Sequence, residues 1–125
     1  MSIGRVLVVD DEPLVLSTVR DMLQYFGYEV STAASAEEAF ASMNAGRSQI
    51  VLLDLHLRGT SGLEGLTSLR ELYPTVPVIV ATGDIGHRLA REARDSGAFE
   101  VISKPFNLTI LRSLLARAMT LAPPQ

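Results

Sequence analysis

Polar residues that could bind a cation or a phosphoryl group follow directly after four apolar runs of this sequence. In chain order these residues are Asp10, Asp11 and Glu12, then Asp54, then Thr82, and finally Lys104 with Pro105. Carboxylate oxygens are the ligands that Mg²⁺ prefers in proteins, and an ammonium group can stabilise charge on a phosphoryl group. These residue types fit an oxygen-rich cation site with one positive charge beside it.

The set is more informative than any one of its members. A single Asp after a strand is more often a helix N-cap than a ligand, and Glu12 fits an acid in the first turn of a helix. Two carboxylates about 4 Å apart, however, repel by about 4 kcal/mol at an effective dielectric constant of 20. Lys104 is also the only lysine in the chain. A charge cluster that costs stability indicates a functional site.

The apolar runs have the length and the β-branched composition of buried strands. They cover residues 5–9, 50–53, 76–81 and 101–102, and a weaker fifth run at residues 28–33 has the polar neighbours of a strand nearer the sheet edge. Helical spacing of apolar residues separates the runs, for example at Leu16, Val19, Leu23 and Phe26, and at Leu108, Leu111, Leu115 and Ala118. Each strand is therefore followed by a helix.

Residues typical of helix ends agree with this alternation. Pro13 fits a helix start, Gly27 a helix end, Ser35 with Glu38 a capping box, and Asn107 the N-cap of the last helix. Parallel strands need crossover connections, so the pattern predicts an α/β fold with a doubly wound, five-stranded parallel sheet and helices on both faces. Ligands bind such sheets beyond the carboxyl ends of the strands.

Composition limits the remaining possibilities. The chain has 125 residues, a 47% hydrophobic share, a net charge of −3 and no cysteine. We therefore expect one independently folding domain without disulfides, thiolate metal sites or direct nucleic-acid binding. Apolar runs are far shorter than the ~20 residues of a membrane span, and the N-terminus lacks a signal-peptide pattern, so no membrane association and a cytoplasmic location are expected.

Four motifs together resemble one known family. They are residues 6–12 (Val-Leu-Val-Val-Asp-Asp-Glu), Asp54 with Gly62-Leu63-Glu64, Ala81-Thr82-Gly83, and Lys104-Pro105-Phe106. In order and spacing these motifs resemble the receiver domains of response regulators in bacterial two-component signalling. The resemblance implies a flavodoxin-like fold with strand order 2-1-3-4-5. We expect the receiver domain to span residues 1–121, with a tail or the start of a linker at residues 122–125.

The resemblance also implies roles for individual residues. Asp54 would accept a phosphoryl group from the phosphohistidine of a histidine kinase or phosphotransfer protein, forming an aspartyl phosphate. Mg²⁺, or Mn²⁺ in its place, would be held by Asp11, Asp54 and the backbone carbonyl of His56, with Asp10 acting through water; the His56 side chain is not expected to take part. Thr82 and Lys104 would contact phosphoryl oxygens. The Lys104-Pro105 peptide bond would be cis.

Signalling partners follow from the resemblance as well. An output domain or a second copy would contact the fourth helix, around Arg88, Arg91 and Arg94 after His87, together with the fifth strand and the last helix. Two residues depart from the family pattern: Arg58 replaces a common Pro, and Val101 replaces the Tyr or Phe whose ring usually moves during signalling. We expect Phe99, two residues upstream on the same strand face, to be a poor substitute for that ring. Activation would then rearrange Thr82, the loop around Asp84 and Ile85, and the fourth helix.

Two other functions are compatible with parts of the pattern. A Mg²⁺-dependent phosphohydrolase of the haloacid-dehalogenase type also uses an Asp at a strand end, but it carries Asp-x-Asp where this chain has Glu12 as the third residue. A receiver-like interaction module that is never phosphorylated usually lacks one of the acids or the lysine. A phosphorylation switch that is not a conventional enzyme therefore fits the sequence best.

Overall fold

Strands and helices alternate along the whole chain. The computed structural model describes residues 2–46, 48–57, 61–83 and 88–124, so Arg58, Asp84, Ile85 and His87 lie outside the described residues. The elements are β1 (Arg5–Val9), α1 (Pro13–Tyr25), β2 (Glu29–Ala33), α2 (Ala36–Ala45), β3 (Ile50–Asp54), α3 (Gly62–Leu72), β4 (Val78–Thr82), α4 (Arg88–Asp95), β5 (Glu100–Ser103) and α5 (Leu108–Leu121).

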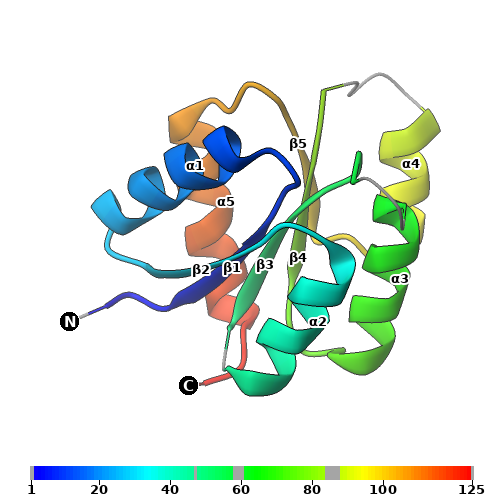
Figure 1. Cartoon of the computed structure of the whole chain (residues 1–125), viewed down its shortest axis with the longest axis horizontal. Helices are drawn as coiled ribbons and strands as arrows, with labels where there is room; N and C mark the ends of the chain where they lie inside the picture. Colours follow the sequence, from blue (N-terminus) through cyan, green and yellow to red (C-terminus); the bar gives the residue numbers. More distant parts are fainter. Residues whose placement is uncertain (1, 47, 58–60, 84–87, 125) are drawn as a thin grey trace.

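The five strands form one parallel sheet in the order β2-β1-β3-β4-β5. Helices α1 and α5 cover one face, and α2, α3 and α4 cover the other (Figure 1). The prediction of a doubly wound, flavodoxin-like fold is confirmed. The chain leaves β1 toward β2 and later returns to β3 on the other side of β1, so the strand order reverses between β1 and β3.

Two apolar cores lie on the two faces of the sheet because alternate residues of a strand point to opposite sides. In β1, Val6 and Val8 pack toward α1 and α5, whereas Leu7 and Val9 pack toward α2 and α3. A sheet covered on both faces explains why the strands read as continuous apolar runs. None of the helices within the described residues is long and apolar enough to cross a membrane.

The helices begin and end at the residues from which their ends were predicted. Pro13 is the first residue of α1, the Ser35 hydroxyl accepts the amide hydrogen of Glu38, the Asn107 side chain accepts that of Ile110, and Gly27 has φ = 103°. Glu12 differs from the expectation. It occupies the N-cap position ahead of α1 rather than the first turn, and within the described residues its side chain makes no capping hydrogen bond.

Strand β1 has the predicted bounds, and the other four strands differ from the predictions by one or two residues at an end. Strand β4 starts at Val78 rather than Val76, since Pro77 has no amide hydrogen to donate. The expected position of Phe99 on the same strand face as Val101 was wrong. Phe99 precedes β5 and packs in the core on the α5 side, whereas Val101 lies in the core on the α4 side. Alternation of side chains applies inside a strand, and Phe99 lies outside it, two residues after the left-handed Gly97.

The start of α3 lies directly against the backbone of Leu55, the residue that follows Asp54. The Gly62 amide donates to the Leu55 carbonyl oxygen at 3.2 Å. A Cβ atom at Gly62 would lie less than 3.0 Å from three backbone atoms of Leu55. Glycine therefore stands at this position because the helix starts directly against backbone.

We predict opposite effects of two alanine substitutions in α3. Gly62→Ala should lower the free energy of unfolding by about 1–3 kcal/mol, because rigid backbone must move to admit the methyl group. Gly65→Ala is the matched control: among the described residues no atom lies within 4 Å of its added Cβ, so it should raise stability by about 0.5–1 kcal/mol. Urea denaturation measures both, and equal effects would contradict the steric argument.

Candidate functional site

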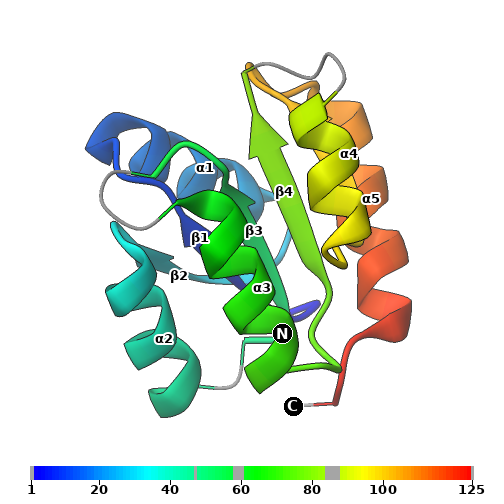
Figure 2. The same ribbon diagram turned by 90° about the vertical axis from the view of Figure 1, so that its right-hand side faces the viewer.

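The carboxyl ends of the strands bring the predicted site residues to one edge of the sheet. Asp54 is the last residue of β3 and is paired in register with Ala81 of β4, so Asp54 and Thr82 end neighbouring strands. Lys104 follows the last residue of β5, and its amide donates to the Thr82 carbonyl oxygen at 2.9 Å, which places Lys104 beside the end of β4. This edge lies away from both chain termini, as the arrowhead of β4 shows (Figure 2).

Asp10 and Asp54 are held in the same way at two adjacent strand ends. Their side chains are only 4% and 5% exposed. In each carboxylate, Oδ1 accepts the backbone amide hydrogen of the residue two positions later, Glu12 or His56, at 3.0 Å. Aspartate commonly closes such turns on its own backbone. One oxygen of each carboxylate is thereby fixed, and the other faces the site.

The Lys104 ammonium lies between the second carboxylate oxygens, Oδ2, of Asp10 and Asp54. Its Nζ atom is 2.8 Å from Asp10 Oδ2 and 3.5 Å from Asp54 Oδ2. Partial burial alone would lower the pKa of Lys104, but the hydrogen bond to Asp10 and the charges of both aspartates outweigh it and raise that pKa above its ordinary value of 10.5. Lys104 therefore stays protonated at neutral pH. The raised pKa contributes stability that is present at neutral pH and is lost as the pH rises through the folded-state value.

Asp11 joins the two buried aspartates in a cluster that fits a hard cation. One carboxylate oxygen from each of Asp10, Asp11 and Asp54 lies within 4.8 Å of the others. Octahedral Mg²⁺ binds oxygens at about 2.1 Å, so two ligands on opposite sides are about 4.2 Å apart. The three oxygens are therefore close enough to surround one such ion, either directly or through a bound water. The donors are all oxygens, as Mg²⁺ requires.

Thr82 and His56 form a contact that sequence reasoning missed. The Thr82 side chain is fully buried, and its hydroxyl Oγ1 lies 3.0 Å from Nε2 of the His56 imidazole. The resemblance assigns a role to the backbone carbonyl of His56 and none to its side chain. The available signal was the sequence Leu55-His56-Leu57, in which the two leucines are buried and the histidine between them points the other way.

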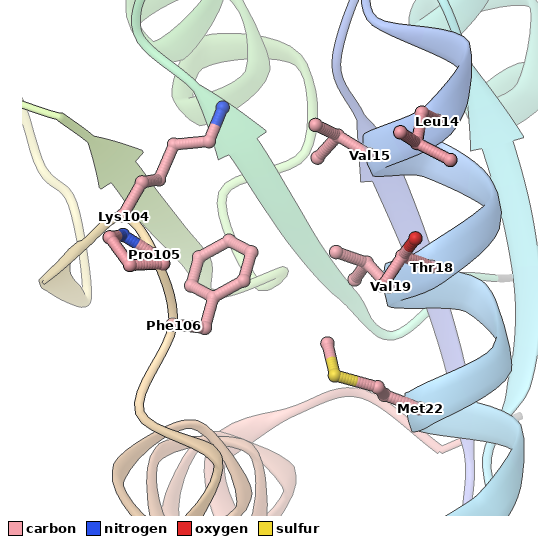
Figure 3. Close-up of a pocket in the computed structure, with 8 residues that line it drawn as sticks. All are labelled: Leu14, Val15, Thr18, Val19, Met22, Lys104, Pro105 and Phe106. Carbon is pink, nitrogen blue, oxygen red and sulfur yellow. The ribbon is translucent and has the colours of Figure 1, made fainter.

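The turn after β5 forms one wall of an apolar groove beside the site. The Lys104-Pro105 peptide bond is cis, as expected at this position. Phe106 faces Val15 and Val19 of α1 across a groove of about 360 Å³, while the Lys104 side chain points toward the end of β3 (Figure 3). The groove therefore opens next to the ammonium and the buried carboxylates.

Comparison with known sequences identifies a family match over most of the chain. The model of the response regulator receiver domain matches residues 6–116. The nitrogen assimilation regulatory protein NtrX of Azorhizobium caulinodans is 36% identical over 116 residues, which are 91% of this chain and 26% of that protein. The transcriptional regulatory protein PrrA of Mycobacterium tuberculosis is 35% identical over 119 residues, 94% of this chain and 49% of that protein. The chain thus spans between a quarter and a half of these relatives.

Solved structures agree with the sequence comparison. The crystal structure of NtrX from Brucella abortus in complex with ADP superposes with a TM-score of 0.89 at 33% identity. The match covers 96% of this chain and 27% of the NtrX chain. The chemotaxis protein CheY4 of Vibrio cholerae gives a TM-score of 0.87 at 30% identity, with 94% and 99% covered. At these identities the likeness extends to sequence as well as fold.

We predict that Lys104→Met destabilises the protein in the absence of metal. Asp10 and Asp54 would stay buried without their shared cation, so the free energy of unfolding at pH 7 should fall by about 1–3 kcal/mol, less than for a fully buried pair because the lysine is 22% exposed. Arg88→Met, which breaks the exposed Arg88–Glu92 pair, is the control and should cost less than about 0.5 kcal/mol. Urea titrations in EDTA measure both, and equal losses would contradict a coupled charge cluster.

Proposed function

Because this chain belongs to the response regulator receiver domain family, we propose that it is a phosphorylation switch in which Asp54 accepts a phosphoryl group. The observation that carries the proposal is the convergence of Asp54 with Asp10, Asp11 and the only lysine of the chain at one sheet edge. Packing does not require such a cluster, whereas phosphoryl transfer depends on positioned charges.

In the proposed reaction a carboxylate oxygen of Asp54 forms a bond to the phosphorus of a phosphohistidine on a partner protein. The bond between phosphorus and the imidazole nitrogen breaks, and the imidazole keeps the electron pair and leaves. Asp11, Asp54 and the His56 carbonyl oxygen would hold Mg²⁺ or Mn²⁺, with Asp10 acting through water, and the ion would supply positive charge to the phosphoryl oxygens. The product is an aspartyl phosphate.

Lys104 and Thr82 would stabilise the added phosphoryl group. Lys104 is nearer to Asp10 than to Asp54, and a phosphoryl oxygen on Asp54 would give its ammonium a further anionic partner. The Thr82 hydroxyl at the end of β4 would turn toward another phosphoryl oxygen. The adjoining groove supports a protein as the donor, since its apolar walls from α1 and the turn after β5 lie next to the reacting carboxylate.

The output of the switch is proposed to pass through α4, β5 and α5 to an output domain or a second copy. Val101 is 6% exposed and packs among core residues, so it is not a mobile replacement for the usual aromatic ring. Leu108 and Ile110 at the start of α5 are 47% and 51% exposed, which supports partner contacts on that helix. The phosphoryl donor and the partner that receives the output would both contact this chain in the cytoplasm.

We predict that acetyl phosphate with Mg²⁺ adds one phosphoryl group to the protein, seen as a single adduct by intact mass spectrometry. Asp54→Asn should abolish the adduct, because an amide cannot replace the carboxylate nucleophile. Asp21→Asn, at an exposed site on α1, is the control and should react like the wild type. An adduct on Asp54→Asn at the wild-type rate would refute the assignment. Rapid multiple turnover without an adduct would indicate a hydrolase, and no reaction would indicate an interaction module.

We also predict that Mg²⁺ raises the melting temperature. At ten times its Kd, a ligand of the native state adds about 1.4 kcal/mol, which corresponds to a shift on the order of 5 °C for a domain of this size. Asp11→Asn should raise the metal-free melting temperature by relieving carboxylate repulsion and should remove the Mg²⁺ response. Asp21→Asn should keep that response. A wild-type melt that is insensitive to tens of millimolar Mg²⁺ would contradict the metal site.

A further inference from the structure

The contact between His56 and Thr82 joins an exposed side chain to a buried one beside the phosphoacceptor. Nε2 of the imidazole lies 3.0 Å from the Thr82 hydroxyl oxygen, although His56 comes from the loop after β3 and Thr82 from the end of β4. Thr82 itself has no exposed surface. The exposed imidazole therefore contacts a hydroxyl group whose residue is itself out of reach of solvent.

The backbone holds the imidazole in this place. Leu55 and Leu57, on either side of His56, are buried, and the Leu55 amide continues the sheet by donating to the Ala81 carbonyl oxygen at 3.0 Å. The His56 amide donates to Asp54 Oδ1 at 3.0 Å. The side chain of His56 is thus directed by fixed backbone on both sides, unlike a freely rotating surface histidine.

We propose that His56 is a positioning residue that holds the Thr82 hydroxyl in its resting orientation and so opposes the switch. This inference rests on the proposed function, in which Thr82 must turn toward a phosphoryl oxygen. A hydroxyl has one hydrogen, and a phosphoryl oxygen can only accept, so Thr82 must donate that hydrogen to the phosphoryl group. If Nε2 accepts, imidazole and phosphoryl oxygen compete for the same hydrogen. If Nε2 donates, rotation of Thr82 breaks the bond.

The expected size follows from the type of interaction. A hydrogen bond of this kind changes an equilibrium by about two- to tenfold, and the exposed imidazole can exchange its partner for water after Thr82 turns. His56 therefore tunes the balance between resting and switched states and does not block phosphorylation. Its backbone carbonyl remains in place in any side-chain variant.

The test measures the affinity for beryllofluoride, a phosphoryl mimic, in the presence of Mg²⁺ at constant pH. His56→Leu should bind it about two- to tenfold more tightly than the wild type, because the resting bond is missing. His56→Gln, whose amide can reach a position similar to Nε2, should restore affinity toward the wild-type value. In a Thr82→Val background, His56→Leu should have no effect, because His56 acts through the Thr82 hydroxyl.

A second measurement tests the contact in the metal-free protein. Three-bond NMR couplings to the Thr82 methyl group should report the same χ1 rotamer population in the wild type and in His56→Gln, and a changed population in His56→Leu. Unchanged couplings, an unchanged or weaker beryllofluoride affinity of His56→Leu, or an equal gain in the Thr82→Val background would overturn the inference while the proposed function stands. A wild-type protein that binds no beryllofluoride with Mg²⁺ would instead refute the proposed function, and this inference with it.

Discussion

The site depends on one electrostatic constraint, which is that two buried carboxylates share a single ammonium. Asp10 and Asp54 repel each other, and a pair of like charges 4 Å apart costs about 4 kcal/mol at an effective dielectric constant of 20. Lys104 offsets part of this repulsion through its contacts of 2.8 and 3.5 Å. The partly buried Asp11 leaves the cluster with net negative charge. A cation fits this excess charge.

The parallel sheet makes this arrangement possible because it orients each carboxylate by local backbone. At two neighbouring strand ends, an amide hydrogen two residues further along fixes one carboxylate oxygen and leaves the other directed at Lys104. The residue after Asp54 is in turn held by α3, because the Gly62 amide donates to the Leu55 carbonyl oxygen. Groups held in this way need little rearrangement when charge appears on a phosphoryl group, which is the physical basis of electrostatic catalysis.

Sequence reasoning predicted the features that depend on periodicity and on local rules. The alternation of strands and helices, the cap at Asn107 and the grouping of the acids follow from apolar runs, capping chemistry and the common edge of parallel strands, whereas the strand order came from the resemblance to receiver domains. It failed where tertiary packing decides. The face on which Phe99 packs depends on how the chain enters β5, and the contact of His56 with Thr82 depends on how close the loop after β3 comes to the end of β4. The spacing of apolar residues along the sequence does not predict either of these two features.

The packing of α4 bears on how the proposed switch could work without an aromatic ring at position 101. The buried residues of α4 within its described length are Ala90 and Ala93, whereas α3 is anchored by Leu66 and Leu69. Burial of a leucine contributes about 1.5–3 kcal/mol, and an alanine methyl contributes less than half of that. Helix α4 is therefore held more weakly against the sheet than α3. Val101 lies in the same core as the two alanines, so a shift of α4 can be transmitted through small side chains while Val101 keeps its rotamer.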